Sequence, residues 1–240
     1  MDRLFFYIKP EKVIGTNFTL DAEESHHLIH VLRKDIGTEI WLLNGIGTAY
    51  SAIIGSIENK RVSGHVLRTF PGYGENMVPM HLALAILKGD RMKLAIEKAT
   101  EMGVHSIIPL VLDRCIKRNL NTDRMKKIVA SATKQCARSR IPEIAEPITM
   151  KEWLQNTDGT RRLACTLDSN VSINALNKKK SFTSSQSVSV IIGPEGDFSV
   201  REHRMMRDEE IDFISLGSRR LRSETAVVSV LTIINELINT

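Results

Sequence analysis

Two polar loops near the C-terminus limit the folds open to this chain more than any other feature. The first, GPEGDFS, follows the β-branched run Val188–Ile192. The second, LGSRRLRSETA, begins where the apolar run Ile211–Leu216 ends. Each loop leads into an expected helix. Either loop alone is typical of an ordinary turn or of a solvated surface. Together they predict an α/β fold in which both lie at one edge of a parallel sheet, where such folds bind ligands.

Length and composition are those of a folded protein with one large or two small domains. The chain has 240 residues, of which 42% are hydrophobic and 25% charged. The Gly- and Pro-rich segment Phe70–Pro79 is the expected boundary, so we predict domains over residues 1–72 and 73–240. Acidic and basic residues balance in the first, and the net charge of +5 lies in the second. That excess permits a phosphate-facing surface there.

The first domain is expected to be mostly β-structure. Short strand patterns separated by turn residues follow one amphipathic helix over Ala22–Lys34. Asp21 is the expected N-cap of this helix, and Glu24 is expected to complete a capping box. The expected strands are Glu39–Leu43, Tyr50–Ile57 and Arg61–Leu67.

Several kinds of site and location are disfavoured. The first helix holds His26, His27 and His30, but no Cys or carboxylate lies at ligand spacing, so we expect no metal site. Three cysteines without a CxxC pair disfavour disulfides and structural zinc. The first residues do not resemble a signal peptide, and no apolar stretch approaches the length of a membrane span. We therefore expect a cytoplasmic protein.

The second domain alternates strands with helices, which is typical of a parallel sheet. One helix is expected to start at Asp90 and to end at Gly103. The final helix, Glu224–Ile238, is apolar over a wide face, which indicates either a dimer contact or burial within the domain. The tract Asn177–Ser187 is expected to be a polar surface loop. The other expected elements are strands over Met80–Leu87, Ser106–Leu112, Leu163–Leu167 and Val188–Ile192 and a helix over Thr122–Arg138.

The helix expected over Thr122–Arg138 carries a stripe of basic residues. At about 100° per residue, four cations fall on one side of it. Such a stripe is either a solvated face or a track for phosphates, and Arg140 with the cluster Arg114, Lys117 and Arg118 would extend the track. The stripe consists of Arg124, Lys127, Lys134 and Arg138.

Both C-terminal loops, at this separation, resemble those of the RsmE-type ribosomal RNA uridine-N3 methyltransferases of the SPOUT superfamily. The likeness covers nearly the whole chain. It implies an α/β SPOUT methyltransferase with a C-terminal trefoil knot, preceded by a small PUA-like β-barrel that binds RNA. The other segments that resemble family signatures are Leu87–Val104, Asp113–Cys115, Lys134–Ile144 and, in the first domain, MDRLFF and His26–Arg33.

The resemblance also implies a reaction. A homodimer would transfer the methyl group of S-adenosylmethionine (SAM), without a metal, to N3 of one uridine (the U1498 equivalent) in 16S rRNA within the 30S subunit. The SAM site would comprise Leu167, Gly193, Pro194, Glu195, Gly196, Leu216, Gly217 and Leu221. The residues expected to bind RNA are Arg33, Arg114, Arg124, Lys127, Lys134 and Arg140.

Methylation of uridine N3 requires the removal of an imide proton. Glu224 is the expected base and Glu195 the second candidate. Arg138 and Arg222 are expected to stabilise the developing anion. The alternative for Glu224 is a helix-start residue that interacts with the helix dipole. Because N3 lies on the pairing edge, the target base must be unpaired.

The chain departs from the family pattern at four positions, and other functions stay open. A SPOUT methyltransferase for another base or RNA would share the SAM loops. A non-catalytic RNA-binding assembly factor would bind RNA without SAM. Nicotinamide and P-loop enzymes are disfavoured because neither GxGxxG nor GxxxxGK[ST] occurs. The departures are Lys134 in place of an acid, Asp197 in place of Gly, Arg220 in place of an aliphatic residue and Ser223 in place of Thr.

Overall fold

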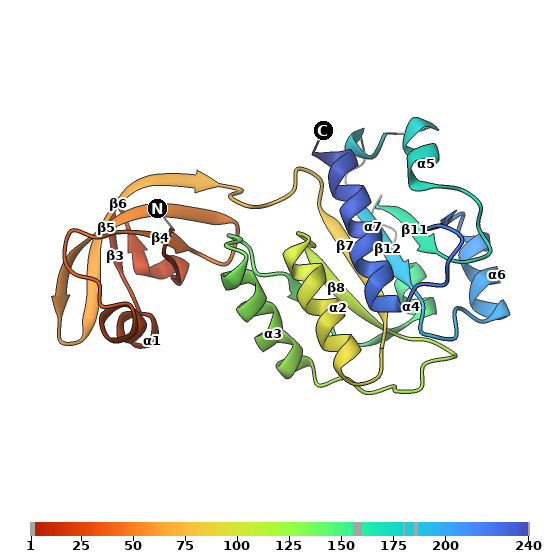
Figure 1. The fold of residues 1–240 in the computed structure, drawn as a ribbon, viewed down its shortest axis with the longest axis horizontal. Helices are drawn as coiled ribbons and strands as arrows, with labels where there is room; N and C mark the ends of the chain where they lie inside the picture. Colours follow the sequence, from red (N-terminus) through yellow and green to blue (C-terminus); the bar gives the residue numbers. More distant parts are fainter. Residues whose placement is uncertain (1–2, 156–159, 180, 185–186, 240) are drawn as a thin grey trace. The chain divides into compact units, whose positions relative to one another are not determined.

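The protein is described here by a computed structural model that covers residues 3–155, 160–179, 181–184 and 187–239 (Figure 1). The chain divides into two compact units. The N-terminal unit consists of Met1–Glu75 together with Thr133–Ile141, which we call the return segment. The C-terminal unit consists of Asn76–Ala132 and Pro142–Thr240. Within the described residues, no helix is both long and apolar enough to cross a membrane.

The N-terminal unit is built on a mixed sheet in the order β1-β4-β5-β6-β3-β2. The three expected strands are confirmed, two of them longer than predicted. The short strands β1–β3 were not predicted, because two or three residues are too few to show alternation. The strands are β1 (Phe5–Tyr7), β2 (Val13–Ile14), β3 (Asn17–Thr19), β4 (Glu39–Leu43), β5 (Thr48–Glu58) and β6 (Arg61–Pro71), with a 3-10 turn, η1, at Pro10–Lys12.

The helix of the N-terminal unit is shorter than predicted. α1 (Ala22–His26) passes into a π-helical turn, η2 (His27–Val31). Asp21 caps α1 as expected, since its Oδ1 accepts a hydrogen bond from Glu24 N at 2.9 Å. The predicted capping box is wrong, because both carboxylate oxygens of Glu24 bind the Lys134 ammonium at 2.6 and 2.8 Å. An ammonium is a stronger partner for a carboxylate than a neutral amide.

The return segment is held to the N-terminal unit by backbone hydrogen bonds. Ile141 N donates to Gly45 O at 2.9 Å, and Ser139 N donates to Tyr73 O at 3.2 Å. The helix before it, α3 (Thr122–Gln135), ends earlier than predicted. Ala137 has a φ of +58°, a left-handed conformation that stops a helix. Arg138 therefore lies outside the helix on which the sequence placed it.

The C-terminal unit contains the predicted parallel sheet, in the order β10-β8-β7-β12-β11-β13, with β9 also paired to β8. The central strand β12 is buried along its whole length, as expected of a strand covered on both faces. The strands are β7 (Met80–Ala85), β8 (Ser106–Val111), β9 (Glu143–Ile144), β10 (Ile148–Thr149), β11 (Arg161–Cys165), β12 (Val188–Ile192) and β13 (Asp212–Ile214).

Helices cover both faces of this sheet. Right-handed crossovers that run in opposite directions along a sheet place their helices on opposite faces. Accordingly α2 packs against α7 (Figure 1), α5 also contacts α7, and α4 contacts α6. The short helices α4 and α5 were not predicted. The helices are α2 (Asp90–Glu101), α4 (Met150–Gln155), α5 (Ile173–Lys179), α6 (Val200–Asp208) and α7 (Ser223–Ile238).

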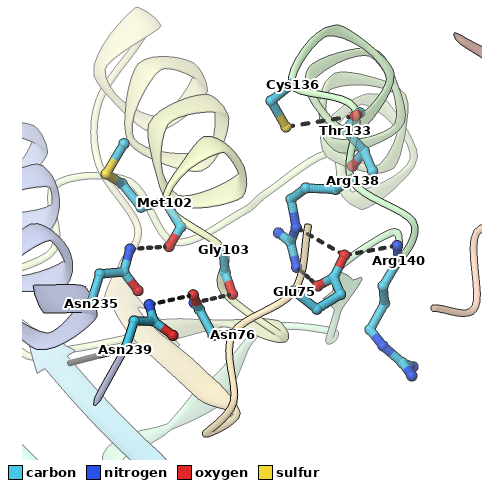
Figure 2. Close-up of polar contacts among 10 residues, drawn as sticks. All are labelled: Glu75, Asn76, Met102, Gly103, Thr133, Cys136, Arg138, Arg140, Asn235 and Asn239. Carbon is cyan, nitrogen blue, oxygen red and sulfur yellow. Dashed lines mark hydrogen bonds and ion pairs between the residues drawn. The ribbon is translucent and has the colours of Figure 1, made fainter. Parts of the chain in front are cut away.

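The end of α2 is tied to α7 and to the chain just before β7. Asn235 Nδ2 donates to Met102 O at 2.7 Å, and Asn76 Nδ2 donates to Gly103 O at 3.2 Å (Figure 2). Gly103 has a φ of +86°, as predicted for the residue that closes this helix. The N-cap of α2 is Gly89, and the predicted cap residue, Asp90, is already helical.

Burial within the C-terminal unit accounts for most of the apolar surface of α7. Val227, Leu231, Ile234 and Ile238 are each at most 1% exposed. The predicted surface loop Asn177–Ser187 is wrong in part, because α5 runs into it and Phe182, in the 3-10 turn η3 (Phe182–Ser184), is fully buried. Residues 180, 185 and 186 of that loop lie outside the described residues.

Candidate active site

Three strands of the C-terminal unit end at the same level. Cys165, the last residue of β11, is in register with Ile192 of β12 and with Ile214 of β13. The loops after these strands therefore start together at the carboxyl edge of the sheet. This confirms the prediction that the two C-terminal loops lie at one edge of a parallel sheet. It adds a third loop, from β11, because that strand lies between the other two.

These loops enclose a cavity of about 570 Å³, its open mouth included. Seven of the eight residues predicted to bind SAM line it. They are Leu167, Gly193, Pro194, Glu195, Leu216, Gly217 and Leu221. The eighth, Gly196, lies next to the cavity, where its carbonyl accepts a hydrogen bond from Arg114 Nη1 at 2.6 Å.

The cavity wall combines apolar side chains with accessible backbone. Leu167 is 50% exposed, which is unusual for a leucine so close to a buried strand. Ile192 and Ala226 extend the apolar wall. Gly217 has a φ of +106°, a conformation that L-residues rarely adopt. An apolar slot with a few backbone donors and acceptors is suited to a flat heterocycle such as adenine.

The loop Gly193–Ser199 is held in place by side chains from three other segments. Ser223 Oγ donates to Gly193 O at 2.8 Å. Ser223 therefore still provides a side-chain hydroxyl at the position where the family pattern has Thr. Arg220, which stands in place of an aliphatic residue, donates to Glu195 O. Arg91, in the first turn of α2, forms an ion pair with the Glu195 carboxylate at 2.6 Å. Contacts of this kind preorganise a binding loop.

Asp197 occupies a position that favours glycine. Its φ is +62°, and its backbone N–H donates to Pro194 O at 3.0 Å to close the turn. Its carboxylate accepts a hydrogen bond from Phe198 N at 2.9 Å. Asp is among the residues that tolerate left-handed backbone conformations. The departure from the family glycine is therefore compatible with the same turn.

Glu224 lies at the start of α7 with one carboxylate oxygen unpartnered. The residue is 9% exposed, and its Oε2 atom is buried without a hydrogen-bond partner among the described residues. Buried polar atoms without a partner are rare and call for an explanation. Arg222, two residues earlier, is exposed at the N-cap position, where its side chain forms no capping bond.

Arg138 belongs to the N-terminal unit, whereas Arg222 and Glu224 belong to the C-terminal unit. The Arg138 guanidinium is 3% exposed and binds Glu75, with Nη2 2.5 Å from Oε2 (Figure 2). The same carboxylate accepts a hydrogen bond from Arg140 N at 2.9 Å. Glu75 thus joins the end of the first domain to the return segment.

The predicted basic stripe is not continuous. Lys134 is paired with Glu24, and Arg138 with Glu75. Both counter-charges come from parts of the chain distant from α3 in sequence. Arg33, Arg124 and Lys127 are exposed.

Some residues of the cavity were missed by the sequence analysis. Thr166 and Arg219 line it, and Arg91 holds one of its loops. The signal for Arg91 was present, because β7 is the neighbour of β12 and the residues after β7 reach the same edge of the sheet. Burial raises the pKa of the Cys165 thiol, which also lines the cavity. That thiol is therefore neutral at physiological pH and is no nucleophile.

Two family models match the chain. The RNA methyltransferase domain matches residues 74–235, and the RNA methyltransferase PUA domain matches residues 20–67. The "Ribosomal RNA small subunit methyltransferase E" of Rickettsia conorii is 30% identical over 91% of this chain and 90% of its own length. The chain belongs to the RsmE-type RNA methyltransferases.

Solved structures of RsmE-type and related methyltransferases share the fold. The Ribosomal RNA small subunit methyltransferase E of Neisseria gonorrhoeae, bound to SAM, superposes with a TM-score of 0.85 and 26% identity, over 98% of both chains. A putative methyltransferase from Legionella pneumophila, also in complex with SAM, has a TM-score of 0.81 and 28% identity over 98% of both chains. Among the described residues, no group of three or more His, Cys, Asp or Glu is arranged to hold a metal ion.

Proposed function

We propose that this RsmE-type protein transfers the methyl group of SAM to N3 of one uridine in 16S rRNA of the small ribosomal subunit. The observation that carries the proposal is the cavity at the carboxyl ends of β11, β12 and β13, lined by seven of the eight predicted SAM residues. Related proteins with the same fold hold SAM. Relatives named Ribosomal RNA small subunit methyltransferase E match over most of the chain.

The cavity residues fit SAM. The half-exposed Leu167 side chain, with Leu216 and Leu221, provides an apolar slot for the adenine. The backbone groups around Gly193 and Gly217 provide the polar contacts. When bound, SAM supplies a methyl group already activated by the positive sulfur. The protein therefore has to position the uridine and to manage charge.

Glu224 is the proposed general base. Its Oε2 atom has no hydrogen-bond partner among the described residues, which leaves it available to accept the N3 proton of uridine. Glu195, the second candidate, is less suitable because Arg91 already binds its carboxylate. Once the proton has moved to Glu224, the uridine carries a negative charge that is shared between N3 and the two flanking oxygens.

Arginine side chains are proposed to stabilise that charge. Arg222 is exposed two residues before Glu224 and carries a full positive charge. Arg138 remains a predicted catalytic group. Because it also holds Glu75, its replacement breaks a buried ion pair, and a loss of activity in that variant alone does not identify a catalytic role.

Single-turnover methyl transfer from radiolabelled SAM to 30S subunits tests the proposal. We expect Glu224→Gln to slow transfer roughly 10²- to 10⁴-fold, the usual contribution of a general base. SAM affinity, measured by calorimetry, is expected to stay within about twofold of the wild type. Glu236→Gln, at an exposed glutamate near the other end of α7, is the matched control and is expected to retain most of the rate. Unchanged transfer by Glu224→Gln would remove Glu224 from the reaction, and absence of transfer by the wild type would refute the proposed function itself.

A further inference from the structure

The N-terminal unit carries a cluster of aromatic rings that the proposed methyl transfer does not use. Aromatic residues make up only 5% of the chain, yet four of them meet here. We call this cluster the aromatic patch. Each member is half-buried, so each ring keeps part of its surface in contact with solvent. The patch consists of Phe5 on β1, Trp41 on β4, Phe70 on β6 and Tyr73 just after β6.

Strand register places the patch on the outer face of the sheet. Phe5 is paired directly with Trp41 across β1 and β4, so their side chains share one face. The neighbouring pair, Phe6 and Leu42, points to the other face and is fully buried in the core. On the face of the patch, Leu43 and Ala49 are fully buried beside Phe70, whereas the four rings keep part of their surface exposed, so they can contact a ligand.

The rings form a compact surface around Trp41. Phe70 stacks on Trp41 with 4.9 Å between ring centroids and 26° between planes. Tyr73 lies 5.1 Å from Trp41, and Phe5 lies 6.0 Å from it. The guanidinium of Arg3 lies 4.5 Å from the Trp41 ring centre and donates to the Tyr73 hydroxyl at 2.8 Å. A flat cationic group therefore already occupies a place over the indole.

Basic side chains surround the patch. Arg3 is exposed. Arg68 is also exposed. Ser51 on β5 pairs with Trp41 on one side and with Arg68 on the other. Arg68 therefore projects from the same face of the sheet as Trp41, two strands away. The Arg140 guanidinium lies beside Gly47. The Gly47 carbonyl accepts a hydrogen bond from the backbone N–H of Gly72, which precedes Tyr73 of the patch. These contacts place Arg140 near the patch. Figure 2 shows this guanidinium pointing away from Glu75.

We propose that the aromatic patch binds one unpaired nucleotide of the RNA substrate, with the base stacked on Trp41 and the flanking phosphates bound by Arg3, Arg68 and Arg140. Proteins recognise unpaired RNA bases by stacking them on aromatic rings or guanidinium planes. The base takes the place of the Arg3 guanidinium over Trp41, and Arg3 moves to the phosphate. A duplex does not fit this surface, because its base faces are covered by their neighbours. The identity of the RNA rests on the proposed function.

Trp41 fluorescence gives a direct readout of stacking. Trp153, the other tryptophan, is 3% exposed in the C-terminal unit, and Trp153→Phe leaves Trp41 as the only tryptophan, whose emission is excited selectively over that of tyrosine. Titration with a short single-stranded oligouridylate is expected to quench Trp41. An RNA duplex of equal length, at the same salt concentration, is expected to give little quenching. Equal quenching by the two RNAs would overturn the proposal. So would an absence of quenching under conditions where the anisotropy of a labelled oligouridylate shows that the protein is saturated.

Affinities of matched variants complete the test. Trp41→Leu is expected to weaken oligouridylate binding roughly 5- to 150-fold, the effect of losing one stacked base. Arg3→Gln and Arg68→Gln are each expected to lower the salt slope of binding by about one unit. Lys60→Gln, in the turn at the far end of the β5–β6 hairpin, is the charge-matched control and is expected to leave stacking unchanged. Should Trp41→Leu fail to fold, as judged by circular dichroism, Arg3→Gln carries the test alone.

The two proposals fail in different ways. If the wild type methylates 30S subunits and Trp41→Leu does so with an unchanged KM for RNA, the patch does not bind the substrate and the methyltransferase assignment stands. If Trp41 is quenched by single-stranded RNA while the wild type transfers no methyl group, the patch stands and the assignment fails.

Discussion

Ion pairs between residues far apart in the sequence decide where the basic side chains of the return segment lie. Lys134 was predicted to bind RNA and Arg138 to stabilise the substrate anion, and both were placed on one basic stripe that was either a solvated face or a track for phosphates. In the structure Glu24 and Glu75 provide the counter-charges. Helical periodicity identifies a charged stripe, but it contains no information about partners from other segments of the chain, here α1 and the segment after β6. The same pairing gives a reason for Lys134 in this chain, where the family pattern has an acid.

The Glu75–Arg138 pair is predicted to matter for stability. Glu75→Gln leaves a guanidinium that is 3% exposed without its counter-charge, and we expect a loss of roughly 3–5 kcal/mol in the N-terminal unit. Hydrogen exchange of the β5 and β6 amides measures it. Asp123→Asn, which breaks an exposed ion pair with Lys126, is the control and is expected to change little. Equal protection in the two variants would contradict this account of Glu75.

Backbone conformation leads to a second prediction, at Asp197. Its backbone φ of +62° is less favourable in free energy for a residue with a β-branched side chain than for Asp or Gly. We expect Asp197→Val to lose about 1–2 kcal/mol in urea unfolding. Asp197→Gly is expected to stay close to the wild type, because relief of strain is offset by the greater freedom of Gly in the unfolded chain. Equal stability of the Val and Gly variants would show that the turn is not strained.

Long, regular elements were predicted well, and short ones were not. Strands β4 and β12 have the predicted bounds, and the parallel sheet follows from the alternation of strands and helices. β2, β9 and β10 have two residues each, and α4 and α5 have six and seven, too few for periodicity to show. The cavity residues were predicted from the resemblance to the RsmE-type family, and the fold agrees with them because they follow strands whose carboxyl ends meet. The capping box of α1 is absent because Lys134 binds Glu24 from a distant part of the chain, and α3 ends early because Ala137 adopts a left-handed conformation.

The start of α6 is the element whose stability we expect to be most sensitive to single substitutions. Ser199 and Glu202 form a full capping box, and Glu202 Oε1 also accepts a hydrogen bond from Asp113 N at 2.8 Å. Ser199→Ala is expected to cost about 1 kcal/mol, measured by urea unfolding. Thr183→Ala, in an exposed turn, is the control, and we expect it to change the free energy of unfolding little. Equal midpoints for the two variants would contradict the role of the cap.

The same region leads to a pH-dependent prediction. Hydrogen bonds from Arg201 and Ser199 hold the pKa of Asp113 below its usual value. A carboxyl group whose pKa is lowered by folding stabilises the protein above its unfolded pKa of about 3.9, and this stabilisation is lost as the pH falls through the folded pKa. The stability difference between the wild type and Arg201→Gln is therefore expected to be larger at pH 7 than at pH 3. A difference that does not change with pH would show that this contact does not affect the titration of Asp113.

At the scale of the whole molecule, each unit supplies a different part of the proposed activity. The C-terminal unit holds the cavity and Glu224, and the N-terminal unit holds the aromatic patch and Arg138. The trefoil knot and the homodimer remain predictions from the family resemblance. Burial of the α7 face within its own unit removes the argument for a dimer that rested on its width. Sedimentation at low concentration measures the oligomeric state.

The most direct measurement is nucleoside analysis of 16S rRNA from cells that lack this protein, before and after complementation. The account predicts that 3-methyluridine is missing from the RNA of the deletion strain, that the wild-type gene restores it, and that Glu224→Gln does not. Treatment of the isolated 30S subunits with purified protein and SAM is expected to restore the same nucleoside. If 3-methyluridine is unchanged in the deletion strain, and purified protein adds no methyl group to its 30S subunits, the central claim is wrong.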